Sequence, residues 1–144
     1  MANKYVEYFN INEQYFPCID EEAIRAGAPW ANTYPHETFI TLLRHVERML
    51  SGDKKPVWIH GAYGTGKSQC GYALKKILEV PEAELRTYWD KFDVLQTNAN
   101  KDLLEKIVGH KSRRIVTAYR YASGGINGTR DLLLAVQDSI KCER

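Results

Sequence analysis

The sequence has few cysteines, no long apolar run and no block of one charge sign. Its three cysteines, Cys18, Cys70 and Cys142, are odd in number and far apart, which excludes a disulfide framework and a zinc-finger spacing. No stretch approaches the roughly 20 apolar residues that cross a bilayer, and the first residues lack the apolar core of a secretory signal. Lysine and arginine (20) nearly balance aspartate and glutamate (18), so the charge does not support a nucleic-acid partner. We therefore expect a cytoplasmic protein with no membrane attachment.

The composition is that of an ordinary globular chain. It has 144 residues, of which 44% are hydrophobic and 26% charged, and it contains no repeat or low-complexity tract. Prolines and glycines interrupt the aromatic-rich segment 1–33. We divide the chain into a lead-in arm with an amphipathic helix, residues 1–55, and a second unit, residues 56–144.

Hydrophobic periodicity predicts helices separated by two short strands. Between Pro35 and Leu50, apolar residues recur every three or four positions, which is typical of an amphipathic helix. The β-branched and aromatic run 56–60 predicts a buried strand that ends at a glycine. Further helices are expected over 66–79, 82–95, 100–108 and 130–141, with a second strand over 115–121 and a glycine-rich turn over 123–128.

One motif carries chemistry. Residues 61–68 read Gly-Ala-Tyr-Gly-Thr-Gly-Lys-Ser, which fits G-x-x-x-x-G-K-[ST] at every fixed position. Glycines let the backbone turn so that main-chain N–H groups approach anionic oxygens, and the following helix directs further N–H groups and the positive end of its dipole at the same place. Lys67 would place a positive charge on the β and γ phosphates, and Ser68 would bind Mg²⁺.

The motif therefore predicts a site for Mg²⁺ and ATP. The expected nucleotide-binding residues are Gly61, Ala62, Tyr63, Gly64, Thr65, Gly66, Lys67, Ser68 and Gln69, with Lys67 also as the catalytic residue and Ser68 as the metal ligand. The absence of an Asn-Lys-x-Asp guanine motif favours ATP over GTP.

The motif, placed between a predicted strand and a predicted helix, resembles the Walker A loop of P-loop NTPases. The amphipathic helix that leads into the first strand, and the helix and strand that follow it, resemble the start of an AAA+ or STAND-type ATPase domain. The resemblance implies an α/β fold with a mostly parallel sheet covered by helices, a helical insertion at about 82–112, ATP hydrolysis, and a homo-oligomeric or multidomain partner.

A P-loop ATPase also needs acidic residues at the end of an apolar strand. The only candidate run is 132–138, and its composition and the cap at Thr129 favour a helix instead. We therefore expect residues 56–144 to be the amino-terminal part of a nucleotide-binding domain that lacks the Walker B acids, with Asp138 and Asp93 as the nearest substitutes.

The predicted function is ATP binding as the engine portion of a larger multidomain ATPase, with hydrolysis dependent on segments outside this chain. Two alternatives stay open: a small P-loop kinase, and a non-catalytic module that responds to nucleotide. His60 could sense the nucleotide, and Arg113 and Arg114 could contact a partner; packing and a solvated turn are the simpler explanations. The aromatic residues Trp30 and Tyr34 are expected to pack in the core.

Overall fold

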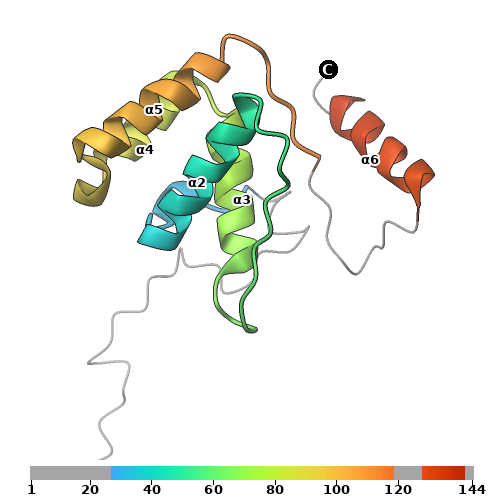
Figure 1. Cartoon of the computed structure of the whole chain (residues 1–144), viewed down its shortest axis with the longest axis horizontal. Helices are drawn as coiled ribbons and strands as arrows, with labels where there is room; N and C mark the ends of the chain where they lie inside the picture. Colours follow the sequence, from blue (N-terminus) through green and yellow to red (C-terminus); the bar gives the residue numbers. More distant parts are fainter. Residues whose placement is uncertain (1–26, 119–127, 142–144) are drawn as a thin grey trace, which may run out of the picture.

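The computed structural model describes residues 27–118 and 128–141, and every regular element in these two ranges is a helix (Figure 1). The elements are the 3-10 helices η2 (Trp30–Asn32) and η3 (Asp93–Leu95) and the α-helices α2 (Glu37–Leu50), α3 (Lys67–Glu79), α4 (Glu82–Asp90), α5 (Asn98–His110) and α6 (Thr129–Lys141).

The helix α2 forms where the apolar periodicity predicts it. Its first turn is capped by His36, whose Nδ1 accepts a hydrogen bond from the Phe39 N–H at 3.3 Å. The helix ends at Ser51, and Gly52 then adopts a φ of +112°, a conformation that favours glycine. The predicted span 35–50 is thus confirmed to within two residues.

The core lies between α2, α3, α4 and α5. α2 packs against α5, α4 against α5 and η3, and α3 against η2. The largest fully buried side chains come from all of these helices and include Trp89, Tyr72, Tyr88, Phe39, Leu43, Ile77, Leu85, Leu95 and Ile107. One buried donor, Trp89 Nε1, has no hydrogen-bond partner within the described part of the chain.

Two buried tyrosines hold the segment before α2 in place. The Tyr72 hydroxyl donates to the Ala28 carbonyl at 2.9 Å, and the Tyr88 hydroxyl donates to the Thr33 carbonyl at 2.8 Å. Trp30 packs against Tyr88 with ring centroids 4.8 Å apart. Each of the two hydrogen bonds satisfies polar groups that burial would otherwise leave unpaired. Trp30 therefore belongs to the core, as predicted, whereas the same prediction is wrong for Tyr34, which is 59% exposed.

The predicted α/β fold with a parallel sheet is wrong. None of the residues in 27–118 or 128–141 forms a strand. Residues 57–60 have the composition of a strand, but they follow an irregular path and make no backbone–backbone hydrogen bond to the described residues. A strand exists only where a neighbour supplies those bonds. Accordingly Trp58, at 88% exposure, and Ile59, at 45%, lie in solvent instead of inside a sheet.

The other predicted helices form, whereas the described part of the second predicted strand does not. The helices predicted over 66–79 and 130–141 are confirmed as α3 and α6, and the pair at about 82–112 becomes α4, η3 and α5. Residues 115–118 of the predicted second strand are irregular; residues 119–121, and 123–127 of the predicted turn, lie outside the described residues. The division at residue 55 stays a prediction.

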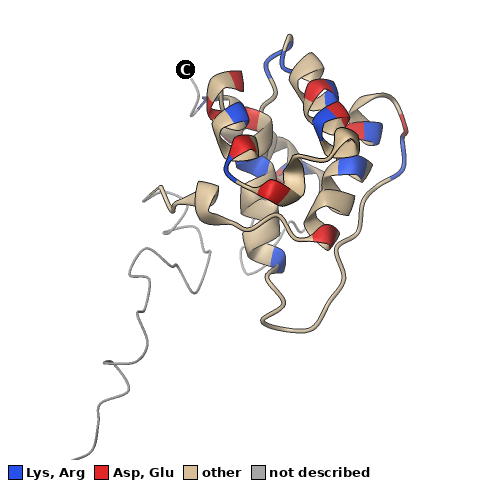
Figure 2. Ribbon diagram, turned by 90° about the vertical axis from the view of Figure 1, so that its left-hand side faces the viewer, with Lys and Arg blue, Asp and Glu red and all other residues tan. Residues whose placement is uncertain are grey.

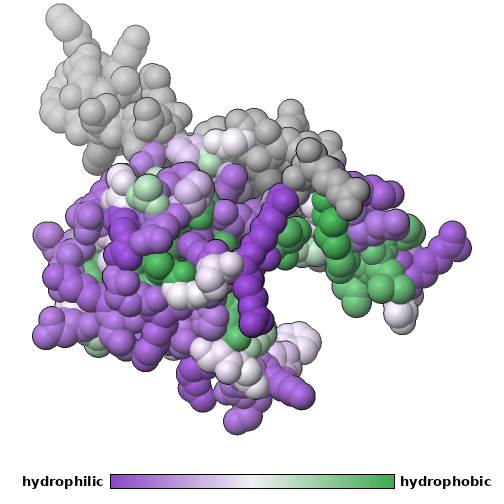
Figure 3. Space-filling view, turned by 90° about the horizontal axis from the view of Figure 1, so that it is seen from above, coloured by the Kyte–Doolittle hydropathy of each residue, from purple (hydrophilic) through white to green (hydrophobic). Residues whose placement is uncertain are grey.

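Charges of both signs are mixed over the helices (Figure 2). α6 differs from the other helices because it exposes a run of large apolar side chains, visible as a green area in Figure 3; they are Leu132, Leu133, Leu134, Val136 and Ile140. No helix among the described residues is both long enough and apolar enough to span a bilayer.

We expect Ile77→Ala to lower the free energy of unfolding by about 2–5 kcal/mol, because its fully buried side chain would leave a cavity in the core. Urea unfolding followed by circular dichroism measures this change. Met49→Ala is the control: that side chain is 41% exposed, and its removal should change stability by no more than about 0.5 kcal/mol. Equal effects of the two substitutions would contradict this description of the core.

Candidate phosphate-binding loop

The loop 61–66 joins the irregular segment 53–60 to the first turn of α3. Its geometry disfavours a side chain at each of its three glycines. Gly64 and Gly66 both have a φ of +79°, which side chains strongly disfavour. A Cβ on Gly61 would lie 2.9 Å from Thr65 Oγ1, which is too close. The conformation of the loop thus favours glycine at positions 64 and 66, and a side chain at position 61 would make Thr65 shift; the motif itself fixes positions 61 and 66.

The side chain of Lys67 folds back over the loop. Its ammonium donates to the Gly61 carbonyl at 2.8 Å and to the Ala62 carbonyl at 2.5 Å. Thr65 Oγ1 also donates to the Ala62 carbonyl, at 2.8 Å. These hydrogen bonds hold the Lys67 ammonium against the loop. The positive charge therefore lies among the residues that the motif predicts to bind phosphate.

The main-chain N–H groups of the loop have no acceptor among the described residues. From Ala62 to Gln69, none of them donates a hydrogen bond to any described residue, and the first amide of α3 that is bonded belongs to Cys70, which donates to the Gly66 carbonyl at 2.9 Å. Gly66, the N-cap, offers no side-chain acceptor to the helix. The start of α3 thus presents unpaired donors at the positive end of a helix dipole.

The other predicted site residues fall into two groups. Tyr63 is fully exposed at the tip of the loop, and Ser68 is exposed in the first turn of α3, where its hydroxyl is accessible to a ligand. The Gln69 side chain is already used, because its Nε2 donates to Thr33 Oγ1 at 2.7 Å. Gln69 therefore offers a ligand its main-chain N–H, while its side chain joins α3 to the segment before α2.

The described residues contain no group of three or more His, Cys, Asp or Glu side chains that could hold a metal ion. Asp93 is exposed in η3, next to α4, and Asp138 is exposed on α6. Any Mg²⁺ held here would therefore depend on Ser68, on phosphate oxygens and on water, an arrangement that suits this strongly hydrated ion.

A small cavity adjoins the loop. It has a volume of about 270 Å³ and lies between α2 and residues 57–60, with Cys70 of α3 also on its wall. His60, which immediately precedes Gly61, is exposed and lines this cavity. The thiol of Cys70 lies 3.7 Å from His36 Nε2, and burial raises the pKa of this thiol, so Cys70 is a packed side chain and not a reactive one.

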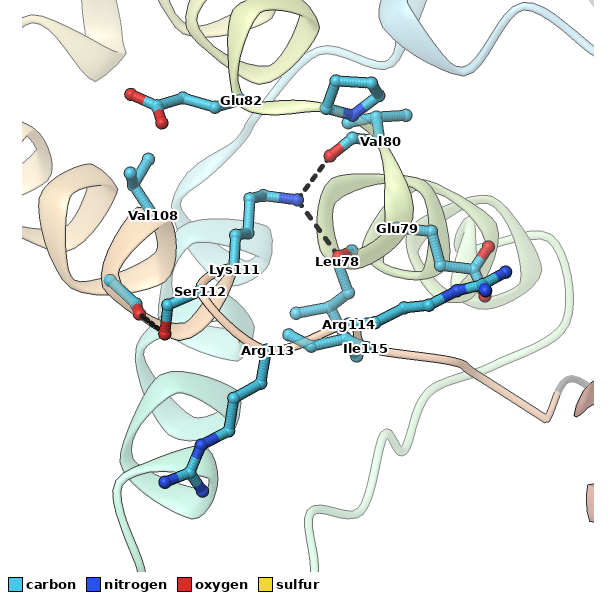
Figure 4. A pocket seen from close by; sticks show the side chains of 12 residues that line it. Leu78, Glu79, Val80, Glu82, Val108, Lys111, Ser112, Arg113, Arg114 and Ile115 are labelled. Carbon is cyan, nitrogen blue, oxygen red and sulfur yellow. Dashed lines mark hydrogen bonds between the residues drawn. The ribbon is translucent and has the colours of Figure 1, made fainter. Parts of the chain in front are cut away.

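A larger cavity, of about 600 Å³, lies between the end of α3 and the end of α5 (Figure 4). Lys111 crosses it and donates to the carbonyls of Leu78 at 3.0 Å and Val80 at 2.6 Å, which caps the carboxyl end of α3. Burial lowers the pKa of the Lys111 ammonium. In Figure 4, Arg113 points away from α3 and Arg114 extends toward Glu79. A contact of these two arginines with a partner stays a prediction.

The Glu79 carboxylate is the centre of a polar cluster at this end of α3. Lys75 Nζ donates to it at 2.6 Å and the Thr117 N–H at 2.9 Å, and the Thr117 hydroxyl donates to it as well. Burial alone would raise the pKa of this carboxyl group, but the hydrogen bonds from Lys75 and Thr117 outweigh burial and lower it. Glu79 thus attaches the irregular segment 115–118 to α3.

No protein-family model, curated protein sequence or solved structure matches this chain. Together with the absence of any strand in residues 27–118 and 128–141, this finding overturns the predicted resemblance to P-loop NTPases and to the AAA+ and STAND ATPase domains. The motif is present, but the sheet that supports it in that class is not found in the described chain.

We expect Glu79→Gln to lower the free energy of unfolding near neutral pH and to have less effect in acid. Because the folded-state pKa of Glu79 lies below its ordinary value of 4.5, its contribution is full above that pH and is lost as the pH falls through the folded-state pKa. Urea unfolding at pH 7 and at pH 3.5 measures the difference. Glu37→Gln, at an exposed position, is the control; a Glu79→Gln effect that is constant with pH would contradict the cluster.

Proposed function

We propose that residues 61–69 bind the polyphosphate of ATP as its Mg²⁺ complex. The observation that carries this proposal is the run of main-chain N–H groups from Ala62 to Gln69 that donate to no described residue, in a loop where Gly64 and Gly66 have positive φ angles. Donors of this kind at the start of a helix are a favourable environment for phosphate oxygens.

The charges of the loop support the same ligand. Lys67 is placed within the curl of the loop, where its ammonium can exchange the carbonyls of Gly61 and Ala62 for phosphate oxygens. Charge-assisted hydrogen bonds contribute about 1.5–3 kcal/mol each, so a few of them account for micromolar affinity. Ser68 follows directly and supplies a hydroxyl for Mg²⁺.

Binding is the part of the predicted function that the loop itself supports. Hydrolysis needs a carboxylate beside the phosphates, and we propose that a larger assembly supplies it, as expected for the engine portion of a multidomain ATPase. A cytoplasmic location suits the proposal, because ATP and Mg²⁺ are plentiful there and Cys70 stays a free thiol.

The experiment is titration of Mg·ATP into the whole chain, measured by isothermal calorimetry. We expect Lys67→Ala to raise the dissociation constant about 10- to 100-fold, because it removes charge-assisted hydrogen bonds to phosphate. Lys101→Ala removes the same charge from an exposed position on α5 and should leave the affinity unchanged.

Release of phosphate is measured in parallel, with and without added acceptors. Binding without turnover indicates a nucleotide-responsive module or an incomplete ATPase, turnover with water alone indicates an ATPase, and turnover only with an acceptor indicates a kinase. If the wild type shows no heat of binding at millimolar Mg·ATP, or if Lys101→Ala weakens binding as much as Lys67→Ala, the proposal is wrong.

A further inference from the structure

The cavity beside the loop is formed by a second stripe of α2. Thr38, Thr41, Leu42 and His45 line it and recur at steps of three, one and three residues, so they share one side of the helix. Phe39, also on the wall, belongs to the buried stripe that faces the core. Residues 57–60 line the other side of this half-open hollow, in which Thr38, Thr41 and His45 remain exposed.

The hollow is continuous with the loop in two places. His60, on its wall, is bonded directly to Gly61, the first residue of the motif. Cys70, also on its wall, follows Lys67 by three residues in α3, a rise of about 4.5 Å along the helix axis. A ligand with its phosphates on the loop therefore has its other end within reach of the hollow.

The lining suits a flat aromatic group with polar edges. Val57, Leu42 and Phe39 supply apolar surface, while the rings of His45 and His60 make no hydrogen bond within the described residues. Trp58, also on the wall, is 88% exposed, so most of its indole is free to stack. Apolar walls with a few unused polar groups are typical of small-molecule sites.

The size of the hollow indicates which part of a ligand it takes. Sites for whole drug-sized molecules have volumes of about 300–1,000 Å³. A cavity of about 270 Å³ is smaller than that range, so it is suited to one ring system and not to a complete nucleotide. The rest of the ligand would lie outside it, on the neighbouring loop.

We propose that this hollow holds the base of the nucleotide whose phosphates bind residues 61–69, with the Trp58 indole stacked on the base and the His45 and His60 rings at its edges. This inference rests on the proposed function, and it adds that recognition extends beyond the phosphates. The site then distinguishes a nucleotide from an inorganic polyphosphate, which has no base to place in the hollow.

The test compares Mg·ATP with Mg²⁺-tripolyphosphate as ligands of the whole chain. We expect Trp58→Ala to raise the dissociation constant of ATP about tenfold, because base–aromatic stacking contributes on this scale, and to leave that of tripolyphosphate unchanged. Trp58→Phe keeps an aromatic face and should recover most of the affinity for ATP. Met49→Ala, at an exposed position of α2 outside the hollow, should affect neither ligand.

Fluorescence gives a second readout. Of the three tryptophans, Trp30 and Trp89 are buried, so ATP should quench the exposed indole of Trp58 while tripolyphosphate should not. Circular dichroism verifies that each variant is folded, which the exposure of Trp58 leads us to expect.

The outcomes separate the two proposals. If Lys67→Ala weakens both ligands while Trp58→Ala weakens neither, or weakens both equally, the base site is wrong and the phosphate loop stands. If neither ligand binds the wild type, the base site and the proposed function fail together.

Discussion

Burial of one face of α3 holds both ends of that helix in position. Tyr72, Ala73 and Ile77 are fully buried, and the Tyr72 hydroxyl also joins the helix to the carbonyl of Ala28. With α3 fixed in the core, Ser68 in its first turn remains exposed beside the loop, and its last turn is available to Lys111. The unpaired N–H groups at one end and the capped carbonyls at the other are therefore consequences of the same packing.

The two ends of α3 satisfy their backbone groups in opposite ways. At the carboxyl end, Lys111 donates to the carbonyls of Leu78 and Val80. At the amino end, the N-cap is Gly66, which has no side chain to accept a hydrogen bond. The carboxyl end of α3 is thus capped within the protein. Its amino end has no side-chain cap and is accessible to a ligand.

The helices were predictable from sequence because their signals are local. The apolar stripe of α2 and the start of α3 after Gly66 both depend on residues within a few positions. The strand predicted over 56–60 is wrong because the composition of a segment says nothing about whether another segment will pair with it. Trp58 therefore fitted the pattern of a buried strand, and it is nevertheless 88% exposed.

The same distinction applies to the site. The motif fixes glycine at positions 61 and 66, and the structure gives a geometric reason for glycine at these positions and at 64. The bond from Gln69 to Thr33, and the cavity formed by α2 with residues 57–60, join segments that are far apart in the chain. The regular spacing of Thr38, Thr41 and His45 was the only sequence signal for that cavity, and it is weak because threonine and histidine also occur on solvated helix faces.

The position of the Lys67 ammonium over the loop affects how strongly the loop would bind a phosphate group. In the structure two carbonyl oxygens accept hydrogen bonds from this ammonium, so the phosphate of the proposed ligand would have to replace them as acceptors. The free energy that Lys67 contributes to binding is then the difference between its hydrogen bonds to phosphate and its hydrogen bonds to the two carbonyls. Under the proposed function, such an exchange of acceptors favours moderate affinity and short residence times, because the ammonium can return to the Gly61 and Ala62 carbonyls when the phosphate leaves.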